Sequence, residues 1–183
     1  MDIVNEIKAS FKQGSYLTQL IYINIAVFVL VNLITVFFFF AGESINDSPI
    51  ISLLAIPADI SELLWKPWTV ITYMFLHEAF LHLLFNMLTL YFFSDAVINQ
   101  VGQIYFIIIY FGSLIAGSLI AVSFHKKEPF YSAVGASGAV SGILYAAILL
   151  NPGMTLLFYF AIPIPGWIFA IGYLLFPSKK GIF

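Results

Sequence analysis

The residues most able to do chemistry in this sequence are a serine between glycines and a histidine–asparagine pair. Ser137 lies in the stretch GASGAVSG, residues 135–142, which is typical of a tight turn running into a helix. Backbone N–H groups at a helix N-terminus are unpaired and lie at the positive end of the helix dipole. They can stabilise an oxyanion formed when Ser137 attacks a carbonyl group. The spacing alone is a weak signal, because Ala139 stands where a nucleophile elbow has its last glycine.

The second candidate group is His82 with Asn86, four residues apart and therefore on one face of a helix. Polar side chains inside apolar segments often mark function. They also serve as packing contacts that hydrogen-bond to neighbouring helices. The spacing leaves both interpretations open, and His125, in a charged loop, has no evident role.

A metal site is a further possibility, since His77, Glu78 and His82 cluster in the sequence. The zinc-protease pattern needs histidines at i and i+4 with a glutamate between them. Here the histidines are five apart, and Glu78 directly follows the first. We therefore expect no metal and no cofactor.

The composition identifies the environment of these residues. The 183 residues are 62% hydrophobic and 9% charged, with a mean hydropathy of +1.02, whereas soluble domains carry roughly a quarter charged residues. The chain is therefore predicted to be a multi-pass protein of the cell membrane. A net charge of −2 without any arginine argues against a nucleic-acid partner. The lack of cysteine excludes disulfides and thiolate chemistry.

Apolar runs separated by turn residues predict one all-α domain over residues 1–183. We expect a cytoplasmic N-terminal segment at 1–19. A connection along the membrane interface is expected at 42–67, followed by a short entry into the bilayer at 68–75. The helix bundle is expected over 20–176, followed by a short polar tail at 177–183. Its helices are predicted at 20–41, about 81–97, 101–124, 137–150 and 166–176.

The predicted fourth helix is unusually short. Its 14 residues make about 21 Å, roughly 9 Å less than the hydrocarbon thickness. Asn151-Pro152-Gly153 fixes its far end, so Ser137 should lie below the opposite surface, at the floor of a cavity. Gly138, Gly142 and Ala146 form a small-residue face for close helix packing, which explains these glycines without catalysis. It does not explain Gly135, which precedes the helix.

The motifs together are more specific than any one of them. FLHEAFLHLLFNMLTLYFF, residues 75–93, followed by GASG at the start of a short helix, closely resembles the rhomboid family of intramembrane serine proteases. The resemblance covers about 20–173 and includes Pro67-Trp68, Thr72-Tyr73, Gly112 and Gly117. It implies a six-helix bundle around a water-filled cavity open to the non-cytoplasmic side.

The resemblance also implies a role for each candidate residue. Ser137 would be the nucleophile, and His82 and Asn86 would hold the oxyanion together with the Ser137 backbone N–H. Gly135 and Gly138 would be structural residues beside the site. His77 matches a family histidine that is structural rather than catalytic.

The sequence departs from the family pattern in two ways. Thr69 follows Trp68 where many members carry arginine, which affects the anchoring of the first loop. The general-base histidine of the sixth helix is absent, and neither His77, His82 nor His125 can replace it. We therefore expect a C-terminally truncated chain with four full transmembrane helices, a partial fifth and no sixth. Such a chain should be inactive and poorly stable, because its small-residue face lacks a packing partner.

The predicted function is that of an intramembrane serine endopeptidase acting on transmembrane segments of other proteins. Its expected partners are these substrates and the lipid bilayer, and the oligomeric state stays open. One alternative is a non-catalytic rhomboid-like protein that binds transmembrane clients. Another is a small transporter or proton-relay protein built around His82 and Asn86.

Overall fold

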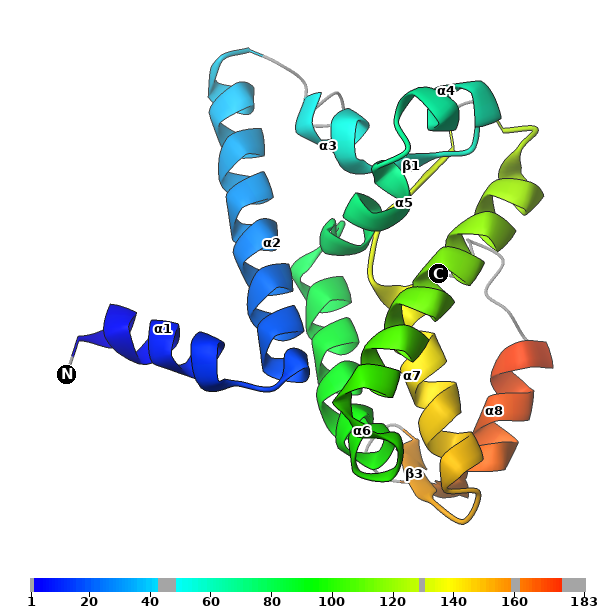
Figure 1. Cartoon of the computed structure of the whole chain (residues 1–183). Coiled ribbons are helices and arrows are strands. Elements are labelled where there is room, and N and C mark those ends of the chain that lie inside the picture. The colour runs from blue at the N-terminus through cyan, green and yellow to red at the C-terminus, as the bar shows by residue number, and fades with distance from the viewer. Residues whose placement is uncertain (1, 43–48, 129–130, 159–161, 176–183) are drawn as a thin grey trace.

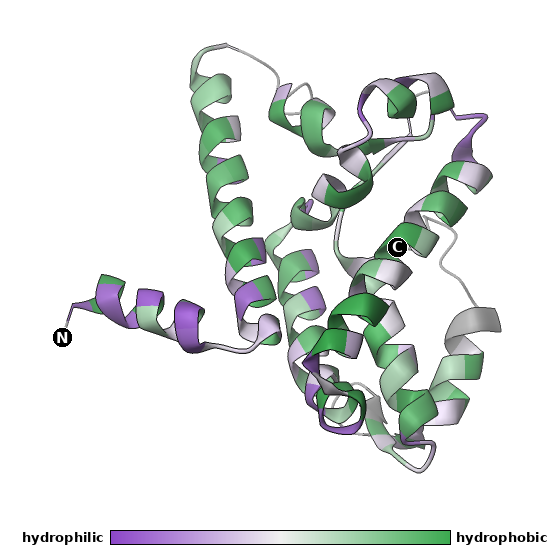
Figure 2. Cartoon of the chain, in the orientation of Figure 1, coloured by the Kyte–Doolittle hydropathy of each residue, from purple (hydrophilic) through white to green (hydrophobic). Residues whose placement is uncertain are grey.

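A computed structural model describes residues 2–42, 49–128, 131–158 and 162–175 (Figure 1). Helices α2, Tyr16–Phe40, and α6, Phe80–His125, are each long and apolar enough to cross a membrane. Figure 2 shows both helices hydrophobic over most of their length. The helical membrane architecture predicted from composition is confirmed at this level.

Helix α6 contains two of the predicted spans as two arms. Its backbone leaves helical geometry at Gly102, with φ 84° and ψ 167°, a conformation that glycine adopts at little cost. The two arms form a V that opens toward α5 in Figure 1. The predicted break at 98–100 is wrong, because these residues continue the first arm and the chain reverses at one glycine.

Two shorter helices follow, α7 at Ser137–Leu150 and α8 at Gly166–Leu175. Both begin where the sequence predicted. The 14 residues of α7 reach about 21 Å, less than a bilayer crossing of about 30 Å. Within the described ranges, the four predicted spans correspond to α2, the two arms of α6 and α7. Of these, α7 is too short to be the full span that was expected. The predicted end of the last helix at 176 and the tail at 177–183 lie outside the described residues.

The described residues also form four short strands, and the structure is still mostly helical, which is consistent with the predicted all-α fold class. Strand β1, Ile56–Pro57, pairs antiparallel with β2, Ser132–Ala133. Strand β3, Thr155–Phe158, pairs with β4, Ile162–Pro165, in a hairpin just before α8. The prolines of β4 exclude a helix and suit an edge strand.

The N-terminal part contains more helix than the sequence predicted. Helix α1, Ile3–Gln13, lies within the N-terminal segment at 1–19, for which no helix was predicted, and α2 begins at Tyr16 rather than at 20. Ser15 fixes that start, since its hydroxyl accepts a hydrogen bond from the Thr18 N–H at 3.3 Å. The described part of the connection after α2, from residue 49 on, forms the short helices α3 at Pro49–Leu54, α4 at Ile60–Trp65, α5 at Thr69–Thr72 and the 3₁₀ helix η2 at Tyr73–Phe75.

The closest helix packing joins α7 to the second arm of α6. A Cβ added at Gly142 would overlap the Ser113 side chain, and one added at Gly117 would lie 3.5 Å from the Gly138 Cα. Small residues on both helices let the backbones approach this closely. The expectation that this face lacks a partner is therefore wrong, because α6 covers it at Gly138 and Gly142.

Candidate active site

The segment that leads into α7 is held from two sides. On one side β2 pairs with β1, with Ala133 opposite Ile56, and the Ala58 N–H donates to the Tyr131 carbonyl at 3.1 Å. On the other side the Gly135 N–H donates to the Tyr73 carbonyl at 2.9 Å. These backbone hydrogen bonds fix the position of the loop that precedes Ser137 and the start of α7.

Gly135 brings this loop against the ring of His82. Its backbone has φ +113°, and a Cβ added there would lie 2.8 Å from His82 Cε1 and 3.0 Å from Nε2. Both the positive φ and the close approach require glycine. The loop immediately before Ser137 and the start of α6 are therefore in contact, although 53 positions separate Gly135 from His82 in the sequence.

Ser137 is the first residue of α7 and is half-buried. Ala136, at the N-cap position, is fully buried. A methyl side chain cannot accept a hydrogen bond, so Ala136 leaves the first N–H groups of α7 uncapped. Backbone donors and a hydroxyl thus occur together at the helix start, an arrangement suited to stabilising negative charge.

Asn86 is buried one helical turn after the half-buried His82. Its Nδ2 donates to the His82 carbonyl at 3.0 Å. A primary amide has two N–H donors, so this bond orients the group and leaves one N–H for another acceptor. The structure keeps the two residues on one face of α6, as their spacing predicted.

His77 packs beside the candidate site without joining α6. Its ring meets that of His82 edge to face, with 5.2 Å between centroids, and its Nδ1 lies 3.4 Å from the Phe75 carbonyl. Burial in the loop ahead of α6, reinforced by the neighbouring His82, lowers the pKa of His77 to about 4. His77 is therefore neutral at physiological pH and limits the positions open to the His82 ring.

Tyr73 is a positioning residue to which the sequence analysis assigned no role. It is buried, its carbonyl receives the Gly135 N–H, and its hydroxyl donates to the Leu114 carbonyl at 3.2 Å. Tyr73 thus connects η2 to the loop before α7 through its backbone carbonyl and to the second arm of α6 through its hydroxyl. The available signal was an aromatic residue with a polar tip in an apolar segment, which finds a hydrogen-bond partner when buried.

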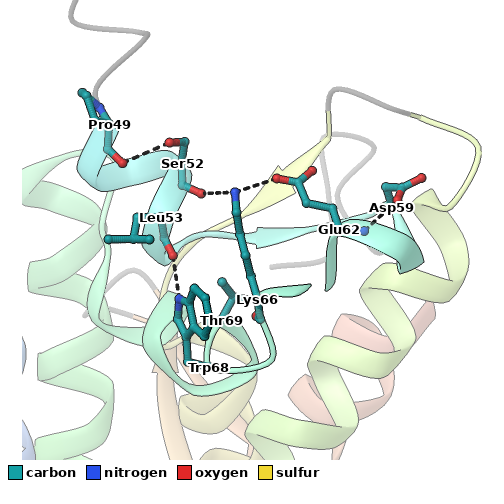
Figure 3. Close-up of polar contacts among 8 residues, drawn as sticks. All are labelled: Pro49, Ser52, Leu53, Asp59, Glu62, Lys66, Trp68 and Thr69. Atoms are coloured by element: carbon teal, nitrogen blue, oxygen red, sulfur yellow. Dashed lines mark hydrogen bonds and ion pairs between the residues drawn. The ribbon is translucent and has the colours of Figure 1, made fainter. Parts of the chain in front are cut away.

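A polar network fixes the short helices before the site (Figure 3). The Trp68 indole N–H donates to the Leu53 carbonyl at 2.9 Å, which ties the start of α5 to α3. The Thr69 hydroxyl donates to the Lys66 carbonyl at 2.6 Å, and Thr69 is fully buried. Lys66 pairs with Glu62 at 2.7 Å. Thr69 therefore anchors this turn through a short local hydrogen bond.

The remaining histidine lies elsewhere. His125 ends the second arm of α6 and stacks on Tyr131, with 3.8 Å between ring centroids. Within the described ranges, no three His, Cys, Asp or Glu side chains are placed to share a metal ion. The structure thus brings Gly135, His82 and His77 together and leaves His125 apart.

Sequence comparison identifies the family of the chain. A family model described as the rhomboid domain matches residues 64–179, more than half of the chain. The chain belongs to the rhomboid family. The matched region of this rhomboid includes α5, both arms of α6, α7 and α8, and with them every candidate site residue.

Individual relatives give the same family and differ in their stated activity. The chain is 39% identical over 77 residues to YdcA of Bacillus subtilis, covering 42% of the chain and 37% of that protein. It is 28% identical over 133 residues to the rhomboid protease GlpG of Klebsiella pneumoniae, covering 73% and 41%. Inactive RHOMBOID-like protein 8 of Arabidopsis thaliana is 29% identical over 120 residues, covering 61% and 34%. The chain spans less than half the length of these relatives.

Proposed function

We propose that this rhomboid carries the site of an intramembrane serine endopeptidase, with Ser137 as nucleophile. The observation that carries the proposal is the contact between the Gly135 loop and the His82 ring, 2.8 Å from a Cβ built on Gly135. This contact places the loop that precedes Ser137 beside the face of α6 that holds His82 and Asn86. A nucleophile, uncapped backbone donors and two polar side chains are parts of an acyl-transfer site, which also requires a general base.

The proposed chemistry begins with attack of the Ser137 oxygen on a substrate carbonyl carbon. The carbonyl π electrons move to oxygen, and the resulting oxyanion accepts hydrogen bonds from the Ser137 N–H, from His82 and from the free N–H of Asn86. Gly135 and Gly138 keep the backbone compact around this group. The imidazole of His77, which is kept neutral by burial, packs against the His82 ring and helps to position it.

The proposed substrates are transmembrane segments of other proteins, met within the bilayer. A helical peptide bond is shielded by its own hydrogen bonds, so a substrate segment has to unwind before Ser137 can reach it. The short α7, which begins at Ser137, supports a reaction below the membrane surface rather than at it. We further propose that the protein resides in the cell membrane with its N-terminus in the cytoplasm.

The proton of Ser137 needs a base, which the 183 residues do not supply. His82 is assigned to the oxyanion, His77 is buried against Phe75, and His125 is stacked on Tyr131. By family resemblance the base is a histidine on a sixth helix. The 183-residue chain is therefore expected to be inactive, since a serine hydroxyl without an adjacent base is a poor nucleophile.

The test compares the 183-residue chain with a form extended by a helix that carries a histidine. The extended form should cleave a transmembrane substrate and react with a fluorophosphonate, and Ser137→Ala should abolish both. Asn86→Ala should slow cleavage by about 10²–10³-fold, as for loss of one oxyanion donor. Ser141→Ala, one turn further along α7, is the matched control and should retain activity.

Two results would overturn parts of this proposal. Cleavage that persists in Ser137→Ala would exclude Ser137 as nucleophile. Ser137-dependent labelling of the 183-residue chain would mean that a base exists within it.

A second candidate function is the binding of transmembrane clients without cleavage. It is favoured by similarity to a relative named as inactive. Client capture that is equal in wild-type and Ser137→Ala chains, with no cleavage in the extended form, would favour this function.

A further inference from the structure

Helix α1 has an apolar face that the site and the bundle do not use. Its apolar side chains are Ile3, Val4, Ile7 and Phe11. An α-helix turns about 100° per residue, so these four side chains occupy an arc of about 100°. The rest of the circumference carries polar or small residues. This pattern is typical of a helix lying between an apolar and an aqueous phase.

The described part of the molecule leaves this apolar face open. The exposed fractions are 72% for Ile3, 53% for Val4 and 49% for Ile7. Figure 1 shows α1 projecting sideways from the lower end of α2, away from the other helices. A run of exposed apolar side chains on so short a helix requires a partner.

The connection to α2 determines where α1 can lie. Only Gly14 and Ser15 separate α1 from the membrane-spanning α2. A Cβ added at Gly14 would lie 2.5 Å from the Ser10 carbonyl oxygen and 2.8 Å from Thr18 Cβ, so the turn is tight. Helix α1 therefore stays beside the end of the span, where the bilayer meets water.

The contacts of α1 with α2 show which side faces the bilayer. The rings of Phe11 and Tyr22 lie 6.4 Å apart, and a hydrogen bond of 3.2 Å joins the Tyr22 hydroxyl to that of Ser10. Tyr22 is about 9 Å along α2 from Tyr16, at 1.5 Å per residue. Phe11 belongs to the apolar arc and Ser10 borders it, so this arc lies on the side of α1 that faces the span and the hydrocarbon.

We propose that α1 is a surface anchor, buried by its apolar face in the interfacial lipid of the bilayer that α2 crosses. Its charges are Asp2, Glu6, Lys8 and Lys12, which cancel. Apolar burial rather than attraction to anionic lipid therefore drives the contact. The anchor depends on neither the catalytic proposal nor the missing base.

The absence of cysteine from the sequence makes the test direct. The full chain is prepared as Ile7→Cys or, on the opposite face of the same helix, Asn5→Cys, and each is nitroxide-labelled. Both are reconstituted into vesicles of phosphatidylcholine alone and of phosphatidylcholine with one-fifth phosphatidylglycerol. Leu33→Cys, in the middle of α2, reports correct insertion.

The label at position 7 should collide with oxygen, enriched in hydrocarbon, several-fold more often than with a water-soluble nickel chelate. The label at position 5 should show the reverse, in both vesicle types. Equal nickel access at positions 5 and 7, with Leu33→Cys protected, would overturn the proposal. Protection of position 7 that disappears when the protein is diluted in lipid would assign the face to a second copy instead. Protection that requires the anionic lipid would overturn the apolar mechanism.

Discussion

Helices α2 and α7 are both strongly apolar, yet they differ in how much of their surface is buried against the rest of the protein. Of the 25 residues of α2, only Leu17, Leu20 and Asn24 are buried, all in the first three turns. Half of the 14 residues of α7 are buried. Apolarity therefore does not tell lipid-facing from protein-facing surface in this chain. The difference lies in size, because α7 presents glycines where α6 approaches and α2 presents large side chains to lipid.

The largest expected effect is at the contact that makes α7 a core helix. Gly142→Val should lower the free energy of unfolding by about 3 kcal/mol or more, the upper end for overpacking, because even a Cβ there overlaps Ser113. Unfolding in detergent, followed by tryptophan fluorescence, measures this. Gly112→Ala on the partner helix is the control, since a Cβ at Gly112 has nothing within 4 Å. Equal stability of the two variants would contradict the tight α6–α7 contact.

A smaller effect is expected at the loop that leads to α7. Gly135→Ala should cost about 1–3 kcal/mol, since it forces a side chain into a positive-φ conformation and against the His82 ring. The measurement is the same unfolding experiment. Gly153→Ala, in the turn at the other end of α7, is the matched control, because nothing lies within 4 Å of its added Cβ. A tolerated Gly135→Ala would mean that the loop can move away from His82.

The smallest effect is expected on α2. Leu33 is 63% exposed, and its side chain meets lipid or detergent whether or not α2 is docked. Leu33→Ala should therefore change the free energy of unfolding by less than about 0.5 kcal/mol, as for other surface positions. Leu20→Ala, at a buried position of the same helix, should be clearly more destabilising. A large loss in Leu33→Ala would show that a protein partner covers this part of α2.

Helices whose ends are marked by glycine or proline turn residues could be predicted from the sequence. Helix α7 begins after a glycine turn and ends before Asn151-Pro152-Gly153, and α8 begins directly after Pro165. Both starts match the structure. The reversal in α6 lies later than the predicted gap at 98–100, because these residues continue the helix up to Gly102. Polar residues at the end of a membrane-spanning arm can lie at the membrane interface without ending the helix.

Features that depend on distant contacts could not be predicted in this way. The residues 135–138 and the pair His82–Asn86 were recognised as a group from family resemblance, whereas the contact between Gly135 and His82 depends on the path of the intervening chain. The partner of Gly142 was missed because small-residue spacing predicts close packing without naming the other helix. Helix α1 was missed because its net composition is polar and only its periodicity is amphipathic.

The reversal at Gly102 has a consequence for biogenesis. A single non-helical residue joins the two arms of α6, so no extended linker between them could remain in water while one arm crosses alone. The two arms are therefore expected to enter the bilayer as a pair during synthesis, each satisfying its own backbone hydrogen bonds. The topology of the first arm then dictates that of the second, and the two ends of α6, at Phe80 and His125, face the same side of the membrane.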